Sequence, residues 1–250
     1  MKTKTDKKRK ISITVKDLEI SYKGLKKFSI KKSLLKLKTS KLEVFEAVKG
    51  VSFEVEEGKI LGIIGKNGSG KSTMLRSLAG IFSPDKGKID LHGNTISLLS
   101  IGVGFQPNLT GYENIFLSGM LLGFREQQIK DKLDEIITFS ELGDFIYKPV
   151  KTYSSGMYSK LAFSITAILE TDIILIDEVL SVGDIQFKAK SYNKMKELIS
   201  DDKRTVIIVS HNNSTLQELC DEVLWLHEGK IKMYGEPEEV LNAYQEFMQK

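Results

Sequence analysis

A glycine-rich stretch carries the clearest chemistry in the sequence, because its residue types and spacing suit the phosphates of a nucleotide. It fits the pattern G-x-x-x-x-G-K-[ST] and consists of Gly65, Lys66, Asn67, Gly68, Ser69, Gly70, Lys71 and Ser72. Glycines let backbone amides converge on an anion, and a helix starting at Gly70 adds the positive end of its dipole. We expect Lys71 to reach the β- and γ-phosphates, Ser72 to ligate Mg²⁺ and Thr73 to complete the site. The stretch therefore predicts binding of ATP with Mg²⁺, the alternative being a glycine-rich turn without a ligand.

Two acids follow an apolar run at residues 173–176 that is typical of a buried strand. A carboxylate at the tip of such a strand is costly unless a positive group meets it, and Mg²⁺ suits Asp177 directly or through water. Glu178 can polarise the water that attacks the γ-phosphorus. Without the glycine-rich loop, two acids capping the next helix would be an equal interpretation. Together the two motifs favour ATP hydrolysis, with Glu178 as a catalytic residue.

A histidine, His211, follows a third apolar run at residues 206–209. A histidine after a strand is usually structural. Ligands of open α/β sheets, however, bind at the carboxyl ends of parallel strands, and there His211 can hydrogen-bond the γ-phosphate and orient Glu178. We therefore place His211 with Lys71 and Glu178 among the catalytic residues.

These side chains require a sheet whose parallel strands end at one edge. Apolar runs at 60–64, 173–176 and 206–209 predict its buried strands, and a helix is expected from Gly70 to about Leu78. Other strands are expected at 11–22, with a break near Asp17, and at 51–55, 89–91, 96–99 and 223–226, before a closing helix from Pro237. Helical periodicity takes over between about 107 and 170. Residues 1–250 are thus predicted to form one α/β domain with a helical block inserted in it.

The composition is that of a globular protein, with 41% hydrophobic and 28% charged residues. The sequence contains no run of about 18 apolar residues, so it predicts no transmembrane helix. The lysine-rich residues 1–10 lack the apolar core of a secretory signal. The single cysteine, Cys220, excludes an internal disulfide framework and fits a reducing compartment. We expect a cytoplasmic location.

The charge is distributed unevenly along the chain. Residues 1–41 hold 15 Lys and Arg against three acids, whereas the remaining residues hold 22 against 30. Within 23–41, Ile30, Leu34 and Leu37 fall at helical spacing among eight lysines, which predicts a basic amphipathic insertion. A solvated surface, contact with the acidic face of a partner and contact with an anionic membrane remain open interpretations.

The order of the motifs along the chain resembles one protein family. The phosphate loop is followed by Gln106, the segment Tyr-Ser-Ser-Gly-Met at 153–157, Asp177 with Glu178, residues 181–184 and His211, as in the ATP-binding subunits of ABC transporters. The resemblance implies an ABC nucleotide-binding domain, which is a P-loop NTPase fold with an N-terminal antiparallel β subdomain and an inserted α-helical subdomain at about 107–170. It also implies that ATP hydrolysis is coupled to transport across a membrane.

The same resemblance implies a second copy of the chain. In the family two domains pair head to tail, so Ser154 and Gly156 of one copy would touch the γ-phosphate of ATP bound to the other. Gln106, a further catalytic residue by this resemblance, would bind Mg²⁺ and sense the attacking water, and Asp184 would lie on the interface between the copies. Tyr22 falls where the family places an aromatic residue that stacks on adenine, with Phe45 as a competitor.

Four segments are similar to the subfamily that exports cell-surface polysaccharides, including O-antigen, capsule and wall teichoic acid: 103–115, 139–150, 153–158 and 180–184. The segment 139–150 is especially similar to teichoic acid exporters, and the basic insertion before the phosphate loop also fits. The signature segment departs from the family's usual Leu-Ser-Gly-Gly-Gln, because Ser155 replaces a glycine and Met157 the glutamine.

The subfamily resemblance implies a peripheral subunit on the cytoplasmic side of the cell membrane. Two copies would dock beneath a polytopic permease through the region after Gln106, and residues 23–41 would meet the inner leaflet. Some members carry a C-terminal carbohydrate-binding domain. Since this sequence ends at Lys250, we expect none and place substrate choice in the permease.

Three alternatives remain. The first is an ABC importer or an exporter of lipids or drugs. The second is a soluble ABC ATPase acting on nucleic acid, which is disfavoured because such proteins tend to have two nucleotide domains or a long coiled coil, so we expect no nucleic acid partner. The third is a catalytically idle nucleotide sensor, which the joint presence of Lys71, Asp177, Glu178 and His211 disfavours.

Overall fold

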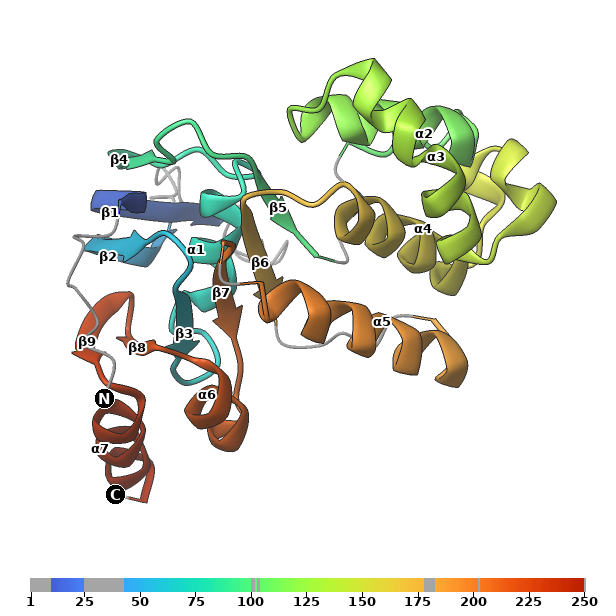
Figure 1. Cartoon of the computed structure of the whole chain (residues 1–250). Coiled ribbons are helices and arrows are strands. Elements are labelled where there is room, and N and C mark those ends of the chain that lie inside the picture. Colours follow the sequence, from blue (N-terminus) through green and yellow to red (C-terminus); the bar gives the residue numbers. More distant parts are fainter. Residues whose placement is uncertain are drawn as a thin grey trace, which may run out of the picture.

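The computed structural model describes residues 10–24, 43–99, 102, 104–177, 183–201 and 203–249. Two β-sheets lie on one side of the molecule, and a block of helices is set off from them on the other (Figure 1). The basic insertion expected at 23–41 lies outside the described residues, apart from the backbone of Lys23 and Gly24. Glu178 and residues 181–182 lie outside them as well.

The larger sheet has six strands in the order β5-β6-β7-β3-β8-β9. Their bounds are β3 Ile60–Ile64, β5 Ile96–Leu98, β6 Ile173–Asp177, β7 Thr205–Val209, β8 Glu222–His227 and β9 Lys230–Gly235. All neighbours are parallel except β8 and β9, which form an antiparallel hairpin. Every residue of β7 is buried, as the near-continuous apolar runs predict for parallel strands covered on both faces. The predicted α/β class is confirmed.

Alternate residues of the parallel strands β3, β6 and β7 enter two separate cores. Ile173 and Leu175 of β6 join the core that contains helix α1 (Lys71–Leu78) and the smaller sheet. Ile174 and Ile176 join the opposite core with α5 (Ile185–Ile199), α6 (Asn213–Leu219) and α7 (Pro237–Gln249). Helix α6 is absent from the sequence predictions, whereas the closing helix from Pro237 is confirmed.

The smaller sheet is antiparallel, with the order β2-β1-β4. Its strands are β1 Ile11–Gly24, β2 Glu43–Glu56 and β4 Lys86–Asp90. The expected break near Asp17 is wrong: β1 continues through a register shift between Val15 and Leu18. Asp17 has a φ of 46° there and its N–H donates to Ser52 Oγ at 2.8 Å, so a bulge absorbs the irregularity. Strand β2 also begins before the predicted 51–55.

The helical block consists of α2 Gly111–Leu121, α3 Glu126–Ser140 and α4 Ser155–Ile168, with 3₁₀ turns at Gly143–Tyr147 and Val150–Thr152. It has a core of its own in which Ile115, Ile136 and Leu161 are fully buried. A capping box starts α2, because Thr110 Oγ1 accepts from the Glu113 N–H while Glu113 accepts from the Thr110 N–H. Among the described residues, no helix is long and apolar enough to cross a membrane.

Candidate nucleotide-binding site

The glycine-rich loop joins the end of β3 to the start of α1 and is shaped by two glycines. Gly68 and Gly70 have φ values of 80° and 105°, in the left-handed region that favours glycine. A Cβ at Gly70 would lie 2.3 Å from the carbonyl oxygen of Ala47 on β2. The loop is thus pressed against β2, and only a residue without a side chain fits at position 70.

Lys71 lies inside this loop although it carries a charge. Its side chain is 6% exposed, and its Nζ donates to the carbonyl oxygens of Gly65 at 2.7 Å and Lys66 at 3.1 Å. Helix α1 starts directly after Gly70 without a side-chain cap, so its first amides can meet an anion. Among the described residues, Ser69 Oγ is buried with no hydrogen-bond partner. These groups together form a cradle for phosphate.

The loop contacts the acid at the end of β6. Ser72 Oγ donates to Asp177 Oδ1 at 3.3 Å, which brings together a hydroxyl and a carboxylate from segments 105 residues apart. Oxygen ligands of this kind suit Mg²⁺, which usually takes one or two protein oxygens and completes its shell with water and substrate phosphates. In the part of the chain that the structure describes, no group of three or more His, Cys, Asp or Glu converges. The oxygen donors of Ser72 and Asp177 fit a Mg²⁺ ion shared with a triphosphate.

The loop opens into a hollow of about 190 Å³. Its walls are formed by Phe45, Ala47, Asn67, Gly68, Gly70, Lys71, Ser72, Thr73 and His211. The structure thus brings His211, from the carboxyl end of β7, to the same hollow as the phosphate loop. Glu178 follows Asp177 directly but lies outside the described residues.

The two aromatic candidates for the adenine contact are cross-strand neighbours, because Tyr22 of β1 pairs with Phe45 of β2. The Tyr22 hydroxyl lies 3.0 Å from Thr73 Oγ1, and its ring meets Phe82 edge-on at 6.0 Å. Phe45 is 58% exposed and lines the hollow. Tyr22 therefore contacts α1, whereas Phe45 presents its ring to the space beside the loop.

Ser154 and Gly156 belong to the helical block, which Figure 1 shows apart from α1 and β3, and Gln106 lies in the segment that leads into this block. Ser154 is exposed and caps α4, where its Oγ accepts from the Met157 N–H at 3.2 Å. Gln106 is exposed too, and its N–H donates to Asn114 Oδ1 at 2.7 Å. Asn114, which no sequence motif predicted, is fully buried and ties Gln106 to α2. An asparagine directly after the capping-box pattern of Thr110 and Glu113 was the available signal in the sequence.

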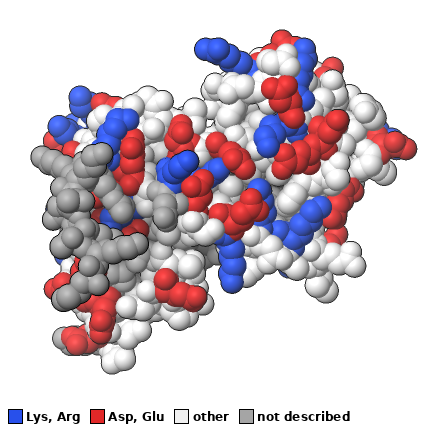
Figure 2. All heavy atoms as spheres, viewed as in Figure 1, with Lys and Arg blue, Asp and Glu red and all other residues white. Residues whose placement is uncertain are grey.

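Asp184 caps α5 and is held by a lysine from the helical block. Lys160 Nζ lies 2.7 Å from Asp184 Oδ2 and 3.3 Å from Glu141 Oε2, and Lys190 Nζ lies 2.9 Å from Glu141 Oε1. The hydrogen bond from Lys160, together with that from the Phe187 N–H, lowers the pKa of Asp184 to about 2. This network joins α4 to α5. Figure 2 shows that basic and acidic side chains are also interspersed over this face of the molecule.

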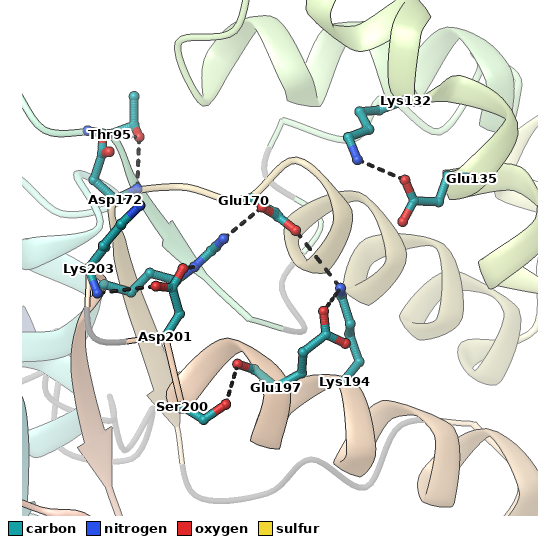
Figure 3. Close-up of polar contacts among 11 residues, drawn as sticks. Thr95, Lys132, Glu135, Glu170, Asp172, Lys194, Glu197, Ser200, Asp201 and Lys203 are labelled. Atoms are coloured by element: carbon teal, nitrogen blue, oxygen red, sulfur yellow. Dashed lines mark hydrogen bonds and ion pairs between the residues drawn. The ribbon is translucent and has the colours of Figure 1, made fainter. Parts of the chain in front are cut away.

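A second polar network closes the opposite edge of the large sheet, at the amino ends of the strands (Figure 3). Arg204, just before β7, pairs with Glu170 at 2.7 Å and with Asp201 at 2.9 Å, and its side chain is 13% exposed. Asp172, just before β6, accepts from the Thr95 N–H at 2.8 Å and from its hydroxyl at 2.7 Å. No sequence motif predicted these pairs. Glu170 with Arg204 and Thr95 with Asp172 join segments far apart in the chain, whereas Asp201 lies only three residues before Arg204.

Residues 48–181 match the ABC transporter family. The chain is 45% identical over 218 residues to the teichoic acids export ATP-binding protein TagH of Lactococcus lactis, an alignment that covers 87% of this chain and 46% of that protein. It is 43% identical over 202 residues to the O-antigen export system ATP-binding protein RfbB of Klebsiella pneumoniae, covering 81% and 82%. The chain thus spans less than half the length of the Lactococcus relative.

Among solved structures, the fold is similar to the dimeric, post-hydrolysis ATP-binding cassette MJ0796 bound to ADP and Pi. The TM-score is 0.65 at 20% sequence identity, and the alignment covers 90% of this chain and 98% of that one. The likeness confirms the predicted P-loop fold.

Proposed function

The chain belongs to the ABC transporter family, and from this premise we propose that it binds and hydrolyses ATP for an exporter of cell-surface polysaccharide or teichoic acid. The Ser72–Asp177 contact carries the ATPase part of the proposal, because it joins a phosphate cradle to a carboxylate that suits Mg²⁺. The names of the relatives, which export teichoic acids and O-antigen, support the choice of cargo.

The loop holds the β- and γ-phosphates through its amides, the start of α1 and the Lys71 ammonium. In the structure that ammonium donates to the Gly65 and Lys66 carbonyls, so it is already at the cradle when a triphosphate arrives. Preformed donors of this kind need little rearrangement as charge develops on the transferred phosphoryl oxygens, which is how most phosphoryl-transfer catalysts work.

Ser72 and Asp177 would hold Mg²⁺, with Gln106 as a further ligand. When bound, Mg²⁺ offsets negative charge on the phosphate oxygens. Glu178, directly after Asp177, polarises the attacking water and takes its proton. His211, which lines the hollow, hydrogen-bonds the γ-phosphate and orients Glu178.

The adenine stacks on the aromatic pair of the small sheet. Phe45 is the ring that lines the hollow, so we assign the stacking contact to it. Tyr22 instead connects β1 to α1, since its hydroxyl lies within hydrogen-bond distance of Thr73. This assignment reverses the preference that the position of Tyr22 in the sequence suggested.

A second copy of the chain completes the site. Ser154 is the exposed N-cap of α4, and Figure 1 shows α4 apart from α1 and β3 of the same chain. The phosphate that Ser154 would contact therefore belongs to a partner. Gly156 follows within the same first turn. The dimeric MJ0796 structure, which holds ADP and Pi, supports this arrangement. In the dimer that we propose for this chain, Asp184 faces the interface between the two copies.

The pair of chains docks beneath a polytopic permease on the cytoplasmic side of the cell membrane. The helical block at about 107–170 provides the contact after Gln106, and residues 23–41 meet the anionic inner leaflet. Closing of the dimer on ATP and its reopening after hydrolysis then drive the permease.

Transport by the purified complex tests the proposal. The chain and its permease are reconstituted in vesicles with a lipid-linked wall polymer, and Mg-ATP is added. We expect ATP-dependent movement of the polymer away from the ATPase side, which Glu178→Gln abolishes while ATP binding persists. Movement towards the ATPase side would identify an importer, and steady ATP turnover by Glu178→Gln at the wild-type rate would remove Glu178 from its role.

A further inference from the structure

The closing helix α7 reaches the phosphate loop. The Lys66 Nζ lies over the ring of Phe247, 5.1 Å from its centroid, although the two residues are far apart in the sequence. The register of the sheet explains the meeting, because Ile64 at the end of β3 pairs with Trp225 of β8. The end of β8, on which α7 packs, therefore lies beside the first residues of the loop.

Phe247 is held in place from the other side. Its ring centroid lies 5.2 Å from Trp225 and 5.0 Å from His227, both on β8. Earlier in α7, Tyr244 packs edge-on against Trp225 at 5.4 Å and is only 8% exposed. A second ammonium, Lys232 Nζ, lies 3.5 Å from the Phe247 centroid. The ring is thus a fixed aromatic surface that attracts cations at the rim of the loop.

The residue that this ring attracts is central to the loop. The Lys66 carbonyl accepts from the Ser69 N–H at 3.1 Å and from Lys71 Nζ at 3.1 Å. The main chain of Lys66 thus sets one of the positions to which the phosphate-binding ammonium is tied. A contact that restrains the Lys66 side chain also restrains the turn from which that carbonyl projects.

We propose that Phe247 is a positioning residue for the phosphate loop, which acts by holding Lys66. The inference rests on the proposed binding of ATP and adds to it a role for α7. A loop restrained before the nucleotide arrives loses less conformational entropy on binding. Phe247 therefore acts on the affinity for ATP and leaves the chemical step unchanged.

Substitutions at position 247 separate the aromatic face from the bulk of the side chain. We expect Phe247→Leu to raise the Kd for Mg-ATP about two- to fivefold, as the loss of a cation–π contact at a partly exposed site would do, with kcat unchanged. Phe247→Tyr keeps the aromatic face and should bind ATP as the wild type does. Met248→Ala, on the exposed side of the same helix, is the matched control. Melting curves of each variant verify folding.

A double-mutant cycle with Lys66→Met gives the decisive result, with Mg-ATP titrated onto the full chain in a Glu178→Gln background. If the two side chains act together, Lys66→Met and Phe247→Leu raise the Kd by less in combination than the product of their separate effects. Independent effects, or a Phe247→Leu protein that binds as tightly as Met248→Ala, would overturn the inference while leaving ATP binding intact. Absence of ATP binding in the parent protein would instead contradict the proposed function.

Discussion

At the amino ends of the six-stranded sheet, carboxylates join neighbouring strands, whereas at the carboxyl ends polar groups surround a hollow. Asp221 accepts from the Ile60 N–H at 2.8 Å and from Lys59 Nζ at 3.1 Å, and Asp172 makes two bonds with Thr95. At the opposite end of β6, Asp177 accepts from Ser72 at a longer 3.3 Å. The carboxylates at the amino ends of the strands thus make several short hydrogen bonds, which Asp177 does not make among the described residues.

This contrast separates stability from function within one sheet. A polar group that already has strong partners contributes to folding and has little to offer a ligand. By contrast, the first N–H groups of α1, which have no side-chain cap, and the Ser69 hydroxyl can donate hydrogen bonds to a phosphate. Substitutions at the amino edge should therefore lower stability, and those at the carboxyl edge should lower activity.

The largest expected effect is at Lys71. Lys71→Met removes the charge that we propose to lie against the transferred phosphate, and we expect ATP hydrolysis to fall at least about a hundredfold. Steady-state phosphate release with Mg²⁺ measures it. Lys59, at the other end of β3, is the matched control: Lys59→Met breaks a partly exposed ion pair with Asp221 and should leave hydrolysis intact. A comparable fall in ATP hydrolysis in both variants would contradict the functional difference between the carboxyl and amino edges of the sheet.

The next largest effect concerns the stacking of adenine. Phe45→Ala should weaken ATP binding about tenfold, since stacking of a base on an aromatic ring contributes on the order of 1–3 kcal/mol. The neighbouring Val44, also exposed on β2, is the control, because alternate residues of a strand face opposite sides. A titration in which Val44→Ala loses as much affinity as Phe45→Ala would reject the stacking role.

At the amino edge, Arg204→Met should leave Glu170 and Asp201 without their shared cation. Both acids are partly exposed and regain water, so we expect a loss of about 1–2 kcal/mol and a fall in melting temperature of roughly 3–6 °C. Calorimetry measures the change, and the rate of ATP hydrolysis at 25 °C should be retained. An unchanged melting temperature would show that the network contributes nothing to folding.

The smallest effect is electrostatic. Lys160 and the Phe187 N–H lower the pKa of Asp184 to about 2 from its ordinary value of 3.8. Because the folded pKa is the lower one, this contact contributes stability above about pH 4 and loses it as the pH falls towards 2. Carboxyl chemical shifts in NMR should give a midpoint near 2 for Asp184. In Lys160→Met the midpoint should rise towards the ordinary value, and an unmoved midpoint would exclude the pairing.

The sequence predicted most of the carboxyl edge because each of its motifs is local. The loop from Gly65 to Ser72, the strand ending at Asp177 and His211 after β7 are read from neighbouring residues, and the fold places the loop, Asp177 and His211 together. The break at Asp17 was wrong because a hydrogen bond to Ser52, distant in sequence, lets the strand continue through a bulge.

The amino edge and the contact of Phe247 with Lys66 could not be predicted in this way. Arg204 and Asp201 are only three residues apart, but they meet Glu170 only once the end of α4 lies beside the start of β7. Phe247 reaches Lys66 only because β8 lies next to β3. Both depend on tertiary packing, for which a single sequence has no periodic signal.

A comparison within one strand tests the account most directly, because Asp172 and Asp177 flank β6. Each is changed to Asn, and both Mg-dependent ATP hydrolysis and melting temperature are measured. Asp177→Asn should lower hydrolysis at least about a hundredfold with little change in melting temperature. Asp172→Asn should lower the melting temperature by roughly 2–4 °C and keep the rate. Wild-type hydrolysis by Asp177→Asn would contradict the account.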